Sequence, residues 1–149
     1  MAQQSSVTFE SIRNFPAVSL NAVQAGVLTS AIIITSVSKT LGASNDTGLL
    51  KNSKQYVTGF GKDGGLNDGS GETATKLNVS LKDNEAAYGA TANYALWQEF
   101  GTRKTRPQPY ARPAVAIATG SKQADVARAI NKEMERGALV AGQRRETFR

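Results

Sequence analysis

The sequence contains no cysteine and no histidine among its 149 residues. The lack of cysteine excludes disulfides and thiolate metal ligands, and it is typical of proteins that fold inside a cell. The lack of histidine excludes His-based catalytic triads and the common zinc sites. Both absences argue against an enzyme, and we expect no catalytic residue, no cofactor and no metal ion.

The sequence also has no uninterrupted run of 18 apolar residues, and residues 1–6 lack the basic-then-apolar layout of a signal peptide. We therefore expect no membrane contact. A chain of this length suits one domain with its own hydrophobic core. We expect that domain over residues 1–136, followed by a basic C-terminal tail over residues 137–149.

The positive charge is concentrated in the second half of the chain. Residues 1–75 carry five basic and five acidic side chains, whereas residues 76–149 carry thirteen basic and seven acidic ones, which gives the whole net charge of +6. Such asymmetry is typical of contact with nucleic acid or with an acidic protein surface. A solvated basic face explains the charge equally well.

An apolar repeat predicts a long helix from about residue 17, after Pro16, to residue 41, before Gly42. The β-branched residues 32–34 favour a strand locally and Gly26 weakens a helix, but the helical period holds for more than twenty residues. A short alternating run over residues 7–12 is interpreted as an edge strand. The apolar positions of the helix are Leu20, Val23, Val27, Ile34, Val37 and Leu41.

Alternation in the middle of the chain predicts an antiparallel sheet with one face packed on the long helix. A tight turn at Asp83 and Asn84 joins the second and third strands. Val79 is at the centre of the clearest strand, so we expect an aspartate there to be strongly destabilising. The inward positions are Tyr56, Thr58 and Phe60 in the first strand, Leu77, Val79 and Leu81 in the second, and Ala86, Tyr88 and Ala90 in the third.

A glycine-rich loop over residues 61–75 separates the first two strands and offers little to bury. We expect it to be the least ordered internal segment of an isolated subunit. The motif Gly59-Phe-Gly61-Lys-Asp-Gly64 matches a dinucleotide-binding pattern, but no helical pattern follows it. The acidic and amide side chains of the loop depart from calcium-loop spacing, which favours a solvated loop; they are Asp63, Asn67, Asp68 and Glu72.

An alanine-rich apolar repeat predicts a last helix that begins near Pro113 and ends at Gly137. Gly120 and Ser121 are expected to interrupt it, with Ser121 capping the second part. The complete chain is therefore expected to be α+β, with a long N-terminal helix and a C-terminal helix packed on a small antiparallel β-sheet.

Residues 94–115 contain the only tryptophan and three of the four prolines of the chain. Tyr94, Trp97 and Phe100 recur at helical spacing, and Gly101 ends that short helix. We expect the three aromatic side chains to close the core under the sheet. Glu99 has no histidine or paired carboxylate nearby in the sequence, so its expected role is a hydrogen bond or an ion pair that fixes the following loop.

Four basic residues follow within ten positions, and they are too close in the sequence to be paired with one another. We expect them either to be solvated or to contact a partner or DNA. They are Arg103, Lys104, Arg106 and Arg112.

The same segment resembles the signature of the neck or tail-completion (head–tail joining) family of long-tailed bacteriophages. The signature is Tyr-Ala, an aromatic residue, Glu-aromatic-Gly-Thr, a variable basic loop, Pro-aromatic, and Arg-Pro-Ala at the last helix. Gln98 departs from it, because an apolar residue is usual there, and residues 46–49 with Ser53 resemble the family's link between first helix and sheet. The matching structural residues are Tyr94, Trp97, Glu99, Phe100, Gly101, Thr102, Pro109, Tyr110 and Pro113, with Ala95, Arg112 and Ala114.

This resemblance implies a structural virion protein, assembled in the host cytoplasm, that forms a homo-oligomeric ring in the phage neck or tail end. The favoured ring is a hexamer, with a dodecamer as the alternative. Its expected partners are other neck and tail proteins and DNA that passes through the lumen. Six copies of a four-charge loop would place about 24 positive charges around one axis. The alternative is a free-standing, non-sequence-specific nucleic-acid-binding protein, although the loop lacks interleaved aromatic residues and the sequence shows no DNA-reading motif.

Overall fold

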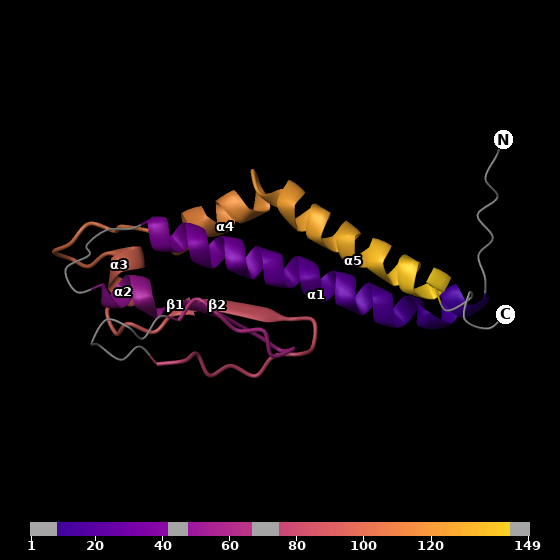
Figure 1. The fold of residues 1–149 in the computed structure, drawn as a ribbon. Helices are drawn as coiled ribbons and strands as arrows, with labels where there is room; N and C mark the ends of the chain where they lie inside the picture. The colour runs from indigo at the N-terminus through magenta and orange to yellow at the C-terminus, as the bar shows by residue number, and fades with distance from the viewer. Residues whose placement is uncertain (1–8, 42–47, 67–74, 144–149) are drawn as a thin grey trace.

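In the computed structural model, one long helix forms the middle of three layers (Figure 1). The structure describes residues 9–41, 48–66 and 75–143. The central helix is α1 (Phe9–Thr40), with a small sheet on one side and α4 and α5 on the other. The remaining elements are α2 (Leu49–Ser53), β1 (Lys54–Thr58), β2 (Ala86–Ala90), α3 (Ala95–Phe100), α4 (Ala111–Thr119) and α5 (Gln123–Gln143). The α+β class with helices packed on an antiparallel sheet is confirmed.

Helix α1 is longer than the sequence predicted. It includes residues 9–12, so the edge strand expected over residues 7–12 is wrong for its described part, and residues 7 and 8 lie outside the described residues. It also passes through Pro16, which was expected to precede it. A proline removes one intrahelical hydrogen bond, yet helical backbone can continue on both sides of it when the rest of the helix is stabilised by packing.

The part of α1 from Ser19 to Thr40 is long and apolar enough to span a membrane by length and composition alone, with a mean hydropathy of 1.6. The expectation of no membrane contact rested on uninterrupted apolar runs, and that test misses this segment. In the structure α4, α5 and both strands pack along the same helix, and 22% of the segment is buried within this chain. The absence of membrane contact stays a prediction.

The sheet in the described part of the chain has two antiparallel strands, with Tyr56 opposite Tyr88 in the register. The third strand and the turn at residues 83–84 are where the sequence placed them, whereas the first strand ends at Thr58, before Phe60. Residues 75–82 form no strand, so the clearest strand expected from the sequence is wrong.

Residues 75–82 instead cross the face of the sheet that is turned away from α1. The Gln55 side chain donates to Thr75 O (2.8 Å) and accepts from Leu77 N–H (3.1 Å), so it occupies main-chain groups that a strand partner would use. The Leu77 side chain rests against Gly89. Val79 is 49% exposed, so it is not the buried position that alternation suggested.

The predicted interruption of the last helix is confirmed, because residues 120–122 form a turn between α4 and α5. Ser121 does not cap α5; its hydroxyl donates back to Ile117 O (3.4 Å). Helix α5 continues through Gly137 to Gln143, so the expected stop at Gly137 is wrong, and the boundary proposed there between domain and tail falls inside a helix. Glycine inside a helix costs only about 1 kcal/mol, which packing against α1 can offset.

The glycine-rich loop is described only in part. Gly64 forms a two-way main-chain bridge with Tyr56, which holds the start of the loop against β1. Asp63 pairs with Lys76 (2.7 Å). Residues 67–74 lie outside the described residues. They include the other side chains considered as calcium ligands, Asn67, Asp68 and Glu72, and most of the segment that was expected to be the least ordered.

Candidate functional site

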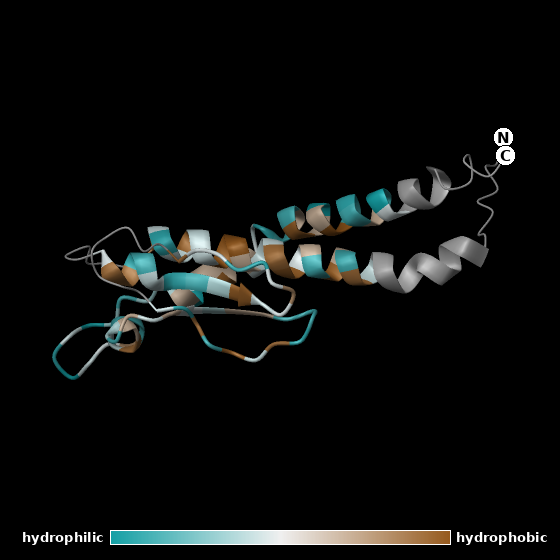
Figure 2. Cartoon of the chain, turned by 60° about the horizontal axis from the view of Figure 1, so that its bottom comes forward, coloured by the Kyte–Doolittle hydropathy of each residue, from teal (hydrophilic) through white to brown (hydrophobic). Residues whose placement is uncertain are grey.

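The segment from α3 to α4 lies at the end of the molecule where α1 terminates (Figure 1). Gly101 ends α3 as predicted: its φ is +77°, which suits glycine, and its N–H donates to Trp97 O (2.7 Å). Residues 102–109 then form an exposed loop that projects from this end and is hydrophilic over most of its length (Figure 2). We call residues 102–109 the basic loop.

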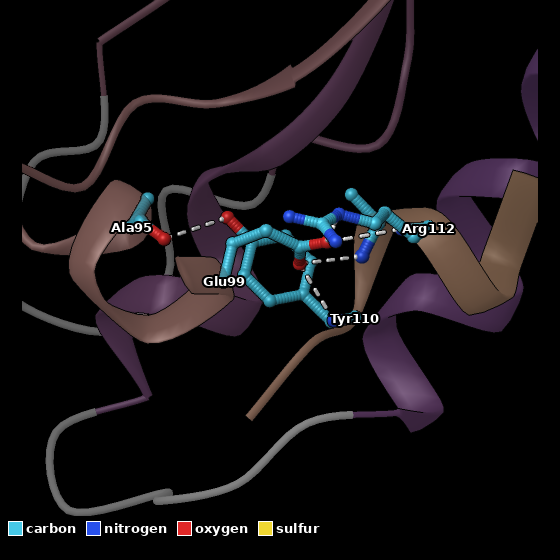
Figure 3. Close-up of polar contacts among 5 residues, drawn as sticks. Ala95, Glu99, Tyr110 and Arg112 are labelled. Carbon is cyan, nitrogen blue, oxygen red and sulfur yellow. Dashed lines mark hydrogen bonds and ion pairs between the residues drawn. The ribbon is translucent and has the colours of Figure 1, made fainter. Parts of the chain in front are cut away.

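The Glu99 carboxylate joins the two ends of the basic loop. Its Oε2 accepts from the N–H groups of Tyr110 (2.7 Å) and Ala111 (2.9 Å), and its Oε1 accepts from the N–H of Arg112 (3.1 Å; Figure 3). These N–H groups are at the start of α4, where a helix has no internal acceptors for them and where its dipole favours a negative charge. The predicted role of Glu99 in fixing the loop is confirmed, and we call this arrangement the Glu99 clasp.

Glu99 is only 6% exposed, yet it stays charged. Burial by itself would raise the pKa of the carboxyl group, but the main-chain donors and the nearby Arg112 guanidinium together hold that pKa below its usual value. The clasp is therefore a buried anion stabilised by hydrogen bonds. It has no neighbouring nucleophile or second carboxylate among the residues that contact it.

Tyr110 connects the clasp to the core. Its ring is buried, its hydroxyl donates to Ala95 O (3.3 Å), and Lys54 Nζ lies 4.0 Å from the ring centre. Lys54 is 2% exposed and donates to Ser38 O and Leu41 O at the C-terminal end of α1. Burial lowers the pKa of Lys54 to about 8, although Glu99 acts in the opposite direction. Sequence reasoning missed Lys54, because nothing in its local pattern indicates the distant carbonyls at the end of α1 that its ammonium meets.

The expectation that Tyr94, Trp97 and Phe100 together close the core is wrong for two of them. Trp97 is 59% exposed and Phe100 is 56% exposed, while Tyr94 packs on the core and its hydroxyl accepts from Leu50 N–H (3.2 Å). The inward positions of α3 are Ala95 and Glu99, four residues apart. The predicted helix is correct, but the face of α3 that is buried differs from the predicted one, because the chain buries the charged Glu99 to make the clasp.

The outward side of α3 is an apolar ridge, which we define as Leu96, Trp97 and Phe100. Leu96 is 64% exposed, more than either aromatic residue. Single exposed apolar side chains are common on protein surfaces, but three on one six-residue helix, directly beside a basic loop, form a patch of the kind that marks an interaction site.

The basic loop itself is shaped by a small turn. Thr102 Oγ1 accepts from the N–H groups of Lys104 (3.2 Å) and Thr105 (3.0 Å), and Gln108 N–H donates to Gln98 O (2.8 Å). Arg103, Lys104 and Arg106 are exposed and form no ion pair in the part of the chain that the structure describes. Pro109 is exposed. Helix α4 begins two residues before Pro113, which is therefore its third residue rather than its first.

Arg112 differs from the other three basic residues. Its Nε lies 3.8 Å from Glu99 Oε1, and its guanidinium lies over the Phe100 ring, 4.6 Å from the ring centre. The side chain remains 67% exposed but is turned back onto the clasp and the ridge. Arg112 therefore belongs to the base of the loop, and three charges rather than four point freely outward.

Comparisons of the chain with protein-family models, with curated proteins and with solved structures found no match.

Proposed function

We propose that this chain is a structural protein of the bacteriophage neck or tail end, which forms a ring and takes part in head–tail joining or tail completion around the DNA channel. The observation that carries the proposal is the coincidence between the signature and the clasp. The signature residues Tyr94, Glu99, Gly101 and Tyr110 each have a defined contact in one connected unit, and that unit holds out the apolar ridge and the basic loop.

Such a unit suits assembly better than catalysis. The buried carboxylate is saturated by main-chain donors, so it is a poor general acid or base. The exposed groups beside it are apolar and cationic, which are the groups that bury area and select acidic partners at interfaces. The proposed partners are further copies of the chain, other neck and tail proteins, and DNA in the lumen.

A ring makes the basic loop electrostatically important. With Arg112 held by Glu99, each copy presents Arg103, Lys104 and Arg106, so a hexamer would carry about 18 loop charges around its axis. Phosphate contacts of this type do not depend on base sequence, so DNA could pass without being read.

The test reverses the three loop charges in a phage that encodes this chain. The variant Arg103→Glu, Lys104→Glu, Arg106→Glu should fold normally, because exposed charge changes usually alter stability by less than about 0.5 kcal/mol each. Electron microscopy of infected cells should show separate heads and tails. The matched control reverses three exposed basic residues outside the loop, Lys122 in the turn before α5 and Arg128 and Lys132 in α5, and should give joined, infectious particles.

Normal yields of joined particles from the loop variant would contradict the role of the loop. A location of the chain outside the particle, determined by imaging a labelled copy, would contradict the virion role itself. If the isolated subunit shifted DNA with strong salt dependence and was absent from particles, the nucleic-acid-binding alternative would replace the proposal.

A further inference from the structure

A groove of about 600 Å³ lies between α1, α5 and β2. Its floor is apolar and comes from Val23, Val27 and Ile34 of α1, with Val126 and Ile130 of α5 on one side. The other side is formed by the consecutive residues 84–88. Because side chains of a strand alternate between its faces, a wall made by consecutive residues is the edge of the strand rather than one of its faces.

That edge of β2 has no strand partner in the described part of the chain. The main-chain N–H and C=O of Tyr56 both bond to Gly64, on the side of β1 that faces away from β2. In an antiparallel sheet, Tyr56 and the residue opposite it, Tyr88, are therefore a pair without mutual hydrogen bonds. The main-chain groups of Ala86, Tyr88 and Ala90 consequently point away from β1. The groove thus combines an apolar floor with a rim of outward main-chain N–H and C=O groups, and an exposed strand edge of this kind favours association.

We infer that the apolar ridge of one copy of the chain packs into this groove on the next copy. The inference deepens the proposed ring by naming the two surfaces through which its subunits meet. The inward side of α3 packs in a cluster that includes Leu41, just after α1, whereas the groove extends over α1 residues 23–34. At 1.5 Å per residue the two surfaces are on the order of 15 Å apart along the helix. Two different, complementary surfaces on one chain produce a head-to-tail contact, and repeated head-to-tail contacts close into rings.

Charge also favours a second copy of the chain as the occupant. The rim continues into the exposed turn over residues 82–85, where Lys82, Asp83 and Glu85 together give a net charge of −1. The basic loop next to the ridge carries three positive charges without an ion pair in the described part of the chain. Arginine and lysine side chains only donate hydrogen bonds, and the carboxylates and outward C=O groups of the rim accept them. When the ridge enters the groove, the positively charged loop is therefore brought toward the end of the rim that carries a net negative charge.

The area available is consistent with a specific contact. Given the size of aromatic side chains, the exposed parts of Leu96, Trp97 and Phe100 amount to on the order of 400 Å², about half of what one partner buries in a standard interface. The basic loop would supply the remainder. Truncating a central aromatic residue of an interface typically weakens association by about tenfold or more, so Trp97→Ala should raise the dissociation constant by at least that factor.

Cross-linking tests the contact directly, because the chain has no cysteine of its own. Purified Leu96→Cys and Val23→Cys proteins are mixed, at a concentration where light scattering detects oligomers, and treated with a short bismaleimide. The matched control replaces Leu96→Cys with Val115→Cys, another exposed apolar position, on α4. We expect the 96–23 product to exceed the 115–23 product by about tenfold, as a specific contact of this strength should give.

Tryptophan emission and a charge swap provide independent readouts. Trp97 is the only tryptophan, so its emission should shift to shorter wavelength on assembly. Asp83→Lys and the triple loop variant should each weaken association, and combining them should restore part of it. Oligomers without the preferred cross-link, or with unshifted emission, would overturn this contact and leave the ring standing. A chain that stays monomeric at its highest soluble concentration would overturn both.

Discussion

The α1–α5 half of the molecule is packed through apolar contacts, whereas the end that bears α3 and the basic loop adds buried polar groups to a small apolar cluster. Along α1 and α5 the contacts are apolar and close: Gly26 lies against Ile130, and apolar residues line the facing sides of the two helices (Figure 2). At the other end the largest fully buried side chains are polar, namely Lys54, Gln55, Ser38 and Ser53.

The difference teaches what each half is suited to do. Apolar packing is non-directional and sets how close two helices lie. Buried polar groups are directional, since each must meet a partner, and they fix the path of the main chain near the loop. Glu99 and Lys54 hold the backbone at the start of α4 and at the end of α1. A loop positioned in this way loses less entropy when it binds a partner.

The largest effect is expected from the clasp. Glu99→Ala leaves the N–H groups of Tyr110 and Ala111 without an acceptor, and each buried donor left unpaired costs roughly 1–3 kcal/mol. Urea denaturation should show the loss. Glu99→Gln, which keeps an acceptor oxygen, should lose less than half as much, whereas Glu133→Ala, in an exposed pair with Arg136, should change stability by less than about 1 kcal/mol. Equal losses in all three would contradict the polar account of this end.

The clasp also predicts acid sensitivity. The pKa of Glu99 is depressed in the folded state, so its contribution is fully present above the unfolded pKa of about 4.3 and is lost as pH falls through the lower folded value. The free energy of unfolding should therefore decline more steeply below pH 4.3 in the wild type than in Glu99→Gln. Parallel pH profiles would mean that the carboxylate is not held as an anion.

The helical half should respond to size rather than to charge. A Cβ added at Gly26 would lie 2.9 Å from two atoms of the Ile130 side chain, so Gly26→Val overpacks the α1–α5 contact at a cost of roughly 1–3 kcal/mol. Combining it with Ile130→Ala should recover part of the loss in thermal unfolding, because the smaller side chain frees the volume. No recovery would indicate that the two helices are farther apart than described.

Lys54 should make stability rise with pH at the alkaline end. Its pKa is about 8 in the folded protein and about 10.4 when unfolded, so between these values the unfolded state binds more protons and the free energy of unfolding increases with pH. Measurements between pH 8 and 9.5 avoid Tyr88 and Tyr110, whose raised pKa values act in the opposite direction above pH 10. Lys54→Met should flatten most of the rise and leave a part due to Lys39, whose pKa is lowered too. An unchanged slope in the variant would contradict this assignment.

The smallest effect is expected at Val79, where the sequence alone predicted a large one. Because its side chain is about half exposed, Val79→Asp should change the melting temperature little, in line with about 0.5 kcal/mol for surface substitutions. Val57→Asp is the matched comparison, since Val57 is 5% exposed in β1, and it should cost several kcal/mol, roughly 3–5. Equal losses at both positions would mean that residues 75–82 are part of the core.

The sequence by itself determined the features that depend on local spacing and on backbone restrictions. The long helix, the turns at residues 83–84 and 120–122, the strand at residues 86–90 and the end of α3 at Gly101 all follow from periodicity or from glycine and turn chemistry. The fixing role of Glu99 was also predicted, because a lone carboxylate ahead of a loop and a helix start has few other uses.

Only the tertiary structure decided which face each element turns inward. The same period in α3 can bury either its aromatic residues or Ala95 and Glu99, and the N–H groups at the start of α4 select the second. The same alternation at residues 77–81 can join a sheet or cross it, and the Gln55 side chain selects crossing by occupying Leu77 N–H. Lys54 lies in a strand whose pattern says nothing of the α1 carbonyls that its ammonium meets. These choices depend on partners elsewhere in the chain, which a periodic pattern does not identify.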